Sequence, residues 1–80
     1  MQQKKICLSE LAPGEAGRIS EIRITGALRR RLLDLGMIPQ TLVACRNLAP
    51  SGSPLAFWVR GAVIALRRRD AAKILVERES

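Results

Sequence analysis

Residues 26–39 read GALRRRLLDLGMIP, and the rest of the chain has to bury one face of the helix that this stretch predicts. Three leucines follow the i, i+4, i+7 spacing of a helix with one apolar face: Leu28, Leu32 and Leu35. Thr25 is suited to cap the start, because its hydroxyl can accept a hydrogen bond from a free backbone N–H. Gly36 favours the left-handed conformation that ends a helix, and Pro39 cannot continue one. The sequence therefore predicts a helix over about residues 26–36, with its leucine face buried.

Alternating apolar residues predict short strands on both sides of this helix. Five of them span residues 15–22, 41–48, 55–60, 62–67 and 73–76, and a shorter one lies at 5–7. A bulge is expected near Ser20–Glu21, where the alternation breaks, and residues 68–72 fit one helical turn. Short strands with frequent turn residues favour a mainly β fold, a small antiparallel barrel without free sheet edges. The inserted helix would then plug or flank one open end.

Alternation also predicts which side chains leave the core. The inward set of one strand is Leu55, Phe57 and Val59. Trp58 then faces outward beside Leu42 and Ala44 of the neighbouring strand, with Arg46 and Arg60 at the rim. An exposed apolar patch with a basic rim is typical of a protein-binding face. In the alternative, Trp58 lies flat over its own sheet or forms a homodimer contact.

Size and composition bound the class of protein. Eighty residues, 48% of them hydrophobic, supply a core for one domain over residues 1–80. No apolar run approaches the roughly 20 residues that cross a bilayer. The apolar stretch near the N-terminus is too short for a signal peptide, so a cytoplasmic location is expected.

Charge points to acidic partners. Fourteen basic and seven acidic residues give a net charge of +7, which favours nucleic acid, an anionic membrane or an acidic protein face. Arginines cluster at residues 29–31 and 67–69. Single-strand binding usually stacks bases on aromatic side chains, and this chain has one Trp, one Phe and no Tyr. Nucleic-acid binding is therefore the alternative hypothesis. The simpler interpretation of both clusters is a solvated surface whose long arginine stems cover apolar groups.

Residues for catalysis or a resident metal are not grouped in this sequence. There is no histidine, none of the serines has a recognisable general base, and no pair of carboxylates lies in an apolar setting. Cys7 and Cys45 are far apart and fit no zinc-binding spacing, so free thiols are favoured over a disulfide. We therefore expect neither an enzyme nor a cofactor-binding protein, although an incidental divalent metal site stays open.

Four stretches together resemble the FeoA family, the small cytosolic A components of bacterial ferrous iron transport systems. They are LSELAPGEAGRISEI (8–22), GALRRRLLDLGMIPQT (26–41), SGSPLAFWVRG (51–61) and VIALRRRDAAKILVE (63–77). The resemblance covers about residues 8–77 and implies an SH3-like barrel with a helix insertion.

The same resemblance implies a function without chemistry of its own. It implies a non-enzymatic accessory protein that docks on a membrane ferrous iron permease with a cytoplasmic GTP-binding domain and tunes transport. The protein would then be recruited to the inner face of the membrane. Similar barrels end metal-dependent repressors, so a transition-metal-sensing SH3-like module is a further alternative.

Two positions depart from the family pattern. Gln40 stands where glycine is common, so that turn has to form without glycine's free access to positive φ. Trp58 stands where a polar residue is commoner, so its patch is particular to this chain. The partner-binding residues predicted are Trp58, Leu42, Arg46 and Arg60 on the sheet and Arg29 and Arg30 on the helix.

Overall fold

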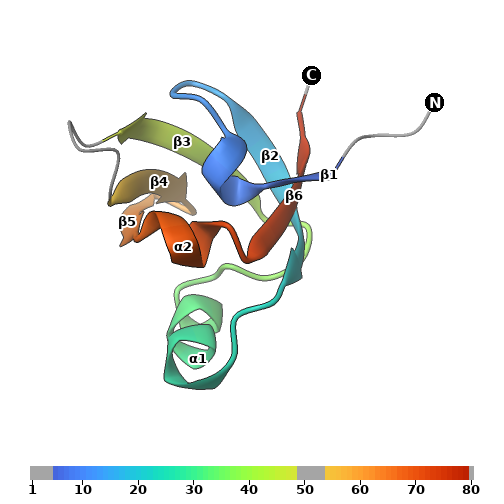
Figure 1. Ribbon diagram of the computed structural model, residues 1–80, viewed down its shortest axis with the longest axis vertical. Coiled ribbons are helices and arrows are strands. Elements are labelled where there is room, and N and C mark those ends of the chain that lie inside the picture. The colour runs from blue at the N-terminus through green and yellow to red at the C-terminus, as the bar shows by residue number, and fades with distance from the viewer. Residues whose placement is uncertain (1–4, 49–53, 80) are drawn as a thin grey trace.

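The computed structural model describes residues 5–48 and 54–79, and these form one bent sheet with two α-helices (Figure 1). In chain order the elements are β1 (Lys5–Cys7), the 3-10 turn η1 (Leu8–Glu10), β2 (Ala16–Ile22), α1 (Gly26–Asp34), β3 (Leu42–Leu48), β4 (Leu55–Val59), β5 (Ala62–Leu66), α2 (Arg68–Ala71) and β6 (Ile74–Arg78). Each predicted strand is present, and the helical turn after β5 is α2.

All six strands of the described chain join one antiparallel sheet in the order β1-β6-β2-β3-β4-β5. The register between β2 and β6 shifts between Ile19 and Glu21, which confirms the predicted bulge. β1 and β5 end the order, and within the described residues no ladder joins them. The expectation that a barrel would remove every sheet edge was therefore wrong, because the sheet curls like a barrel without closing by hydrogen bonds.

The core lies on the concave side of this sheet. Leu55, Phe57 and Val59 are all buried, as the alternation along β4 predicted. Leu8 of η1 and Ala71 of α2 are also fully buried, so both short turns cover the core. Among the described residues no polar or charged side chain is buried, and the interior is therefore held by apolar packing alone.

α1 ends as the sequence predicts. Gly36 has φ 97° and follows the last turn. Its N–H donates to Leu33 O at 3.0 Å, and the N–H of Met37 donates to Leu32 O, also at 3.0 Å. This pair of bonds is a Schellman motif, which satisfies carbonyls that the helix leaves free at its end. The same motif brings Met37 next to Leu32, and both side chains are fully buried.

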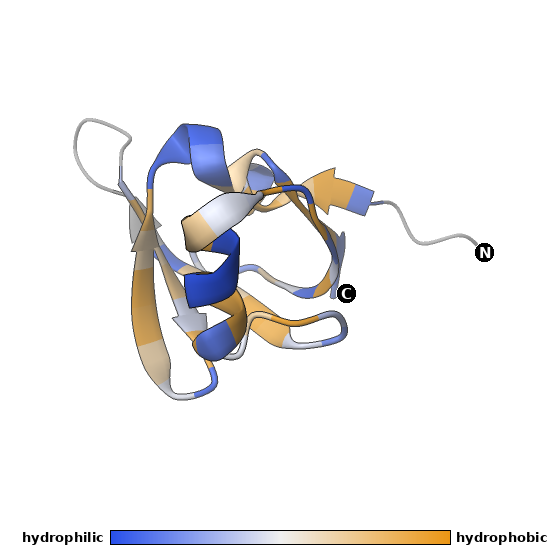
Figure 2. Ribbon diagram, turned by 90° about the horizontal axis from the view of Figure 1, so that it is seen from below, coloured by the Kyte–Doolittle hydropathy of each residue, from blue (hydrophilic) through white to orange (hydrophobic). Residues whose placement is uncertain are grey.

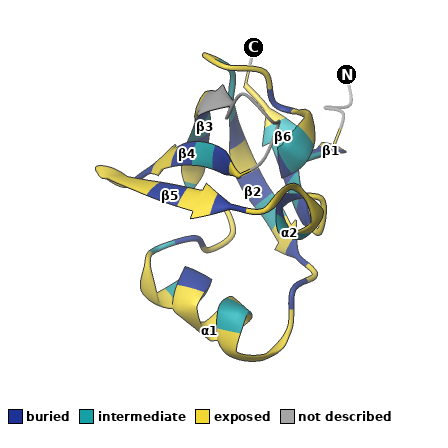
Figure 3. Ribbon diagram, turned by 60° about the vertical axis from the view of Figure 1, so that its left-hand side comes forward, coloured by how far each residue is buried: buried dark blue, intermediate teal, exposed yellow. Residues whose placement is uncertain are grey.

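The leucine face of α1 is only partly buried, which corrects the prediction. Leu32 is 1% exposed, Leu28 is half-buried and Leu35 is 40% exposed. The helix does not lie flush against the sheet, since these leucines line a groove of about 300 Å³ opposite β5. Figure 3 shows α1 largely exposed, set apart from the strands. The helix therefore flanks the sheet and is anchored by Leu32 with Met37.

The predicted cap at Thr25 was also wrong. Thr25 occupies the N-cap position with φ −121°, but its hydroxyl makes no capping hydrogen bond. Gly26 begins the helix at φ 78°, a left-handed conformation that glycine adopts without steric cost. Glycine at this position therefore sets the direction of entry into α1, where the sequence suggested a side-chain cap. Within the described residues, none of the helices has the length and apolar content needed to cross a bilayer.

Gln40 takes the left-handed conformation although it is not glycine. Its φ is 78°, its N–H donates to Ile19 O at 2.7 Å, and its carbonyl accepts a hydrogen bond from Arg18 Nη1 at 3.1 Å. Both backbone groups tie the loop before β3 to β2. These contacts hold the backbone in a conformation that costs a side-chain-bearing residue about 1 kcal/mol or more.

We expect Gln40→Gly to stabilise the protein, because glycine removes this cost and keeps both backbone hydrogen bonds. Glycine also gives the unfolded chain more conformational entropy, which offsets part of this gain. We therefore expect the free energy of unfolding to rise by about 0.5–1 kcal/mol and the melting temperature by about 3–6 °C. Thermal unfolding followed by circular dichroism measures it. Gln40→Ala keeps the strain and should melt within about 2 °C of the wild type. A lower melting temperature for Gln40→Gly would contradict the strain argument.

Candidate functional site

The outer face of β3, β4 and β5 carries a row of exposed apolar side chains. Trp58 pairs with Ala44 of β3 and with Val63 of β5, so these three residues form a line across the strands. Trp58 is 45% exposed, and Leu42, two residues before Ala44, is 44% exposed. The prediction that Trp58 faces outward beside Leu42 and Ala44 is confirmed. We use the name sheet patch for six residues of this face: Leu42, Ala44, Arg46, Trp58, Arg60 and Val63.

Arg46 lies over the indole of Trp58. The guanidinium carbon is 5.8 Å from the ring centroid, within the range of a cation–π interaction. At an exposed site such a contact contributes about 0.5–1 kcal/mol, and it favours one ring position over the many open to a free indole. The sheet patch therefore presents a partly pre-ordered tryptophan with a positive charge stacked on it.

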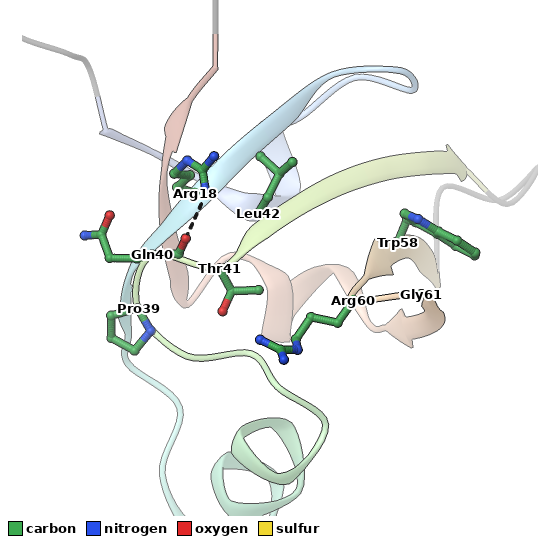
Figure 4. A pocket seen from close by; sticks show the side chains of 8 residues that line it. All are labelled: Arg18, Pro39, Gln40, Thr41, Leu42, Trp58, Arg60 and Gly61. Carbon is green, nitrogen blue, oxygen red and sulfur yellow. Dashed lines mark hydrogen bonds between the residues drawn. The ribbon is translucent and has the colours of Figure 1, made fainter.

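Beside Trp58 the surface is hollowed by about 500 Å³. The hollow is lined by Arg18, Pro39, Gln40, Thr41, Leu42, Trp58, Arg60 and Gly61, which are drawn in Figure 4. Arg18 is held in place by its hydrogen bond to the Gln40 carbonyl and by an ion pair with Glu79, whose N–O distance is 3.7 Å. The hollow thus joins an apolar wall to two guanidinium groups, an arrangement suited to a partner side chain that carries both apolar and acidic groups.

Arg60 is placed by a tight hairpin. Arg60 and Gly61 form the two-residue loop between β4 and β5, and both have positive φ, at 50° and 87°. Positive φ at both positions is typical of the type I′ turn, which is favoured in two-residue hairpin loops. The aliphatic stem of Arg60 lies against Gly36, where an added Cβ would be 2.5 Å from Arg60 Cδ. Gly36 is therefore required for its positive φ, and its contact with Arg60 links the end of α1 to the sheet patch.

The two helix residues predicted for the same site lie elsewhere. Arg29 and Arg30 line a separate depression with Gly26, Leu33 and Asp34. Arg29 Nη1 donates to Ile22 O at 2.9 Å, so this guanidinium ties α1 back to the end of β2. Of the predicted contact residues, the structure brings together the four on the sheet and leaves the two on the helix apart.

The sequence reasoning missed one member of the sheet patch, Val63, and five residues that line the hollow: Arg18, Pro39, Gln40, Thr41 and Gly61. Val63 could have been found, because side chains alternate along β5. Ile64 faces inward, so its neighbour Val63 faces outward on the same side as Trp58. Arg18, Gln40 and Thr41 carry no such signal, since they reach the hollow only through the pairing of β2 with the loop before β3.

The cysteines offer little chemistry. Cys45 is buried, and burial raises the pKa of its thiol, with the carboxylate of Glu15 raising it further. A raised pKa keeps the thiol protonated near neutral pH and lowers its reactivity as a nucleophile or metal ligand. Cys7 is a free, half-buried cysteine. Within residues 5–48 and 54–79, no group of three or more potential metal-ligating side chains is gathered.

Comparison with known proteins identifies the family. Residues 6–78 match the FeoA domain. The chain belongs to the FeoA family. The predicted resemblance is therefore confirmed.

Individual relatives agree with this assignment. The chain is 34% identical over 70 residues to a Fe(2+) transport protein A/Fe(2+) transporter FeoB fusion protein of Porphyromonas gingivalis. That match covers 88% of this chain and 8% of the fusion protein, so the chain spans less than a tenth of that relative's length.

Solved structures show the same fold. The FeoA protein of Chlorobium tepidum superposes with a TM-score of 0.90 at 31% identity, covering 94% of this chain and 71% of that one. The zinc complex of Stenotrophomonas maltophilia FeoA, described as a procaryotic SH3 domain protein, has a TM-score of 0.80 at 28% identity and covers 90% and 89%. The predicted SH3-like architecture with one inserted helix is confirmed.

Proposed function

We propose that this FeoA-family chain is a non-enzymatic accessory protein of bacterial ferrous iron uptake that works on the cytoplasmic side of the membrane. It docks on the GTP-binding part of the iron permease through the sheet patch and modulates transport. The observation that carries the proposal is the P. gingivalis relative, in which the matching domain and a FeoB transporter share one polypeptide.

The fusion supports docking for a physical reason. A domain tethered to its partner works at an effective concentration in the millimolar range, so weak contacts suffice. Without such a tether, the whole affinity has to come from the contact surface of the domain. The sheet patch offers the features of an interaction hot spot, a tryptophan and arginines around a hollow.

The test is binding of the purified chain to the cytoplasmic domain of the permease from the same organism, with and without GTP. We expect saturable one-to-one binding that differs between the nucleotide states and changes the rate of GTP hydrolysis. The chain alone should hydrolyse no GTP. Absence of binding at about 100 μM, near the weak end of specific association, would refute the proposal.

The alternative is a basic barrel that binds nucleic acid, and the net charge of +7 is the observation in its favour. Such binding weakens steeply with salt, because condensed counterions are released from the phosphates. A titration of random-sequence DNA and RNA between about 50 and 200 mM salt separates the two proposals. Tight binding with a steep salt slope, together with no affinity for the permease domain, would favour the alternative.

A metal-sensing role is tested in the same preparation. The S. maltophilia relative was solved as a zinc complex, which makes divalent cations the ligands to examine. We propose that this chain works without a resident metal or cofactor. Calorimetry with Fe²⁺, Mn²⁺ and Zn²⁺ should give no stoichiometric micromolar binding, and a one-to-one site would overturn this part of the proposal.

A further inference from the structure

Charge is divided unevenly between two parts of this protein. Residues 26–73, which hold both helices and β3 to β5, carry nine basic and two acidic residues. Residues 5–25 and 74–79, which hold β1, β2 and β6, carry four basic and five acidic residues. The whole excess of positive charge in the described chain therefore belongs to residues 26–73.

Ion pairing increases this contrast. The three ion pairs within the described residues lie entirely on the second part: Arg18 with Glu79, Arg23 with Glu21, and Arg78 with Glu15. Those acidic residues neutralise their own surroundings. Across residues 26–73 the acidic residues are too few to do the same, and a field of one sign remains there.

The helices concentrate that charge. Arg30 and Arg31 are exposed on α1, and Arg67 and Arg69 are exposed at the start of α2. Arg31 lines the groove between α1 and β5 together with Leu66, the residue before Arg67. Figure 2 shows hydrophilic segments on both helices. We call these four arginines the arginine face.

Apolar side chains accompany the arginines. Leu35 is exposed and Leu28 is half-buried, and both line the groove beside Arg31. Arg67 and Arg69, with Pro54 and Arg68, line a second open depression of about 510 Å³. Surfaces that rest on bilayers combine basic side chains for the headgroups with exposed aliphatic groups for the acyl boundary.

We propose that the arginine face binds the anionic phospholipid surface of the membrane, independently of the docking by the sheet patch. A lipid surface fits better than a nucleic acid, because the side chains among these arginines are aliphatic, whereas the exposed aromatic Trp58 belongs to the sheet patch. It also fits better than one protein partner, since the charge is spread over two helices and two depressions. The inference uses the proposed function only for the presence of a bilayer nearby.

The test is co-sedimentation of the full chain with vesicles of phosphatidylcholine containing 30% phosphatidylglycerol. Binding is expected to these vesicles and not to pure phosphatidylcholine, and it should decrease as salt is raised. Each arginine near an anionic surface contributes about a fivefold factor in affinity. The triple variant Arg30→Gln, Arg67→Gln, Arg69→Gln should therefore bind at least about tenfold more weakly.

The control variant removes the same number of charges from the other part of the chain. Lys5→Gln, Arg23→Gln and Arg78→Gln together leave the same net charge and should bind within about twofold of the wild type. Circular dichroism melts confirm that both triple variants are folded.

Three results would overturn the inference. They are no binding to the anionic vesicles, an equal loss in both triple variants, or tighter binding to random DNA than to vesicles at the same salt. Because the vesicles contain no permease, any of these results leaves the proposed docking to be judged separately.

Discussion

Leu32→Ala should destabilise this protein more than any other change to α1. Leu32 is 1% exposed and packs beside fully buried Met37, which the Schellman motif holds against it. Removing a buried leucine side chain costs about 2–5 kcal/mol, the upper values applying where the site cannot collapse. In a domain of 80 residues that is a large share of the total free energy of unfolding. We expect the melting temperature to fall by more than about 10 °C.

The matched control for this change lies on the same helix. Leu35→Ala removes the same atoms from a side chain that is 40% exposed and should cost less than about 1 kcal/mol. Thermal unfolding of both variants by circular dichroism gives the comparison. A Leu32→Ala protein that melts within a few degrees of the wild type would show that α1 is not anchored through this residue.

Trp58→Ala should have the largest effect on function. Truncating a tryptophan at the centre of an interface commonly costs about 2 kcal/mol or more, which corresponds to roughly 30-fold weaker binding. The change also removes the ring on which Arg46 stacks. The fold should persist, because Trp58 is half exposed and projects from the side of β4 opposite to the buried Phe57. Calorimetric titration of the permease domain measures the loss.

Two controls make this result interpretable. Leu35→Ala, an exposed apolar truncation outside the sheet patch, should bind the permease domain within about twofold of the wild type. Sedimentation of wild type and Trp58→Ala tests the homodimer alternative. If the variant changes only self-association and keeps full affinity for the permease domain, the sheet patch is a contact between copies of this chain.

Sequence reasoning succeeded where one local signal decides the outcome. Alternation placed Phe57 inside and Trp58 outside, and the structure agrees. Gly36 ended the helix at the predicted position with the predicted sign of φ. In each case the physical cause lies within a few residues, either the two-residue period of a strand or the absence of a Cβ.

Sequence reasoning failed where tertiary distance decides the outcome. The spacing of Leu28, Leu32 and Leu35 predicts a shared face, but it cannot say that the helix stands off β5 and leaves Leu35 exposed. Arg29 shares the positive charge of the sheet-patch arginines, yet it hydrogen-bonds to Ile22 O on another side of the protein. Local patterns set the type of each element, and the separations between elements set which residues form one site.

The most direct test of docking through the sheet patch uses the single tryptophan of the chain. In ¹⁵N-labelled protein its indole N–H gives one resonance, which belongs to Trp58 without further assignment. On addition of unlabelled permease domain, we predict that this resonance shifts or broadens together with the amides of Leu42 and Arg60, while the amide of Lys5 stays in place. A complex that forms with the Trp58 indole resonance unchanged would contradict the account.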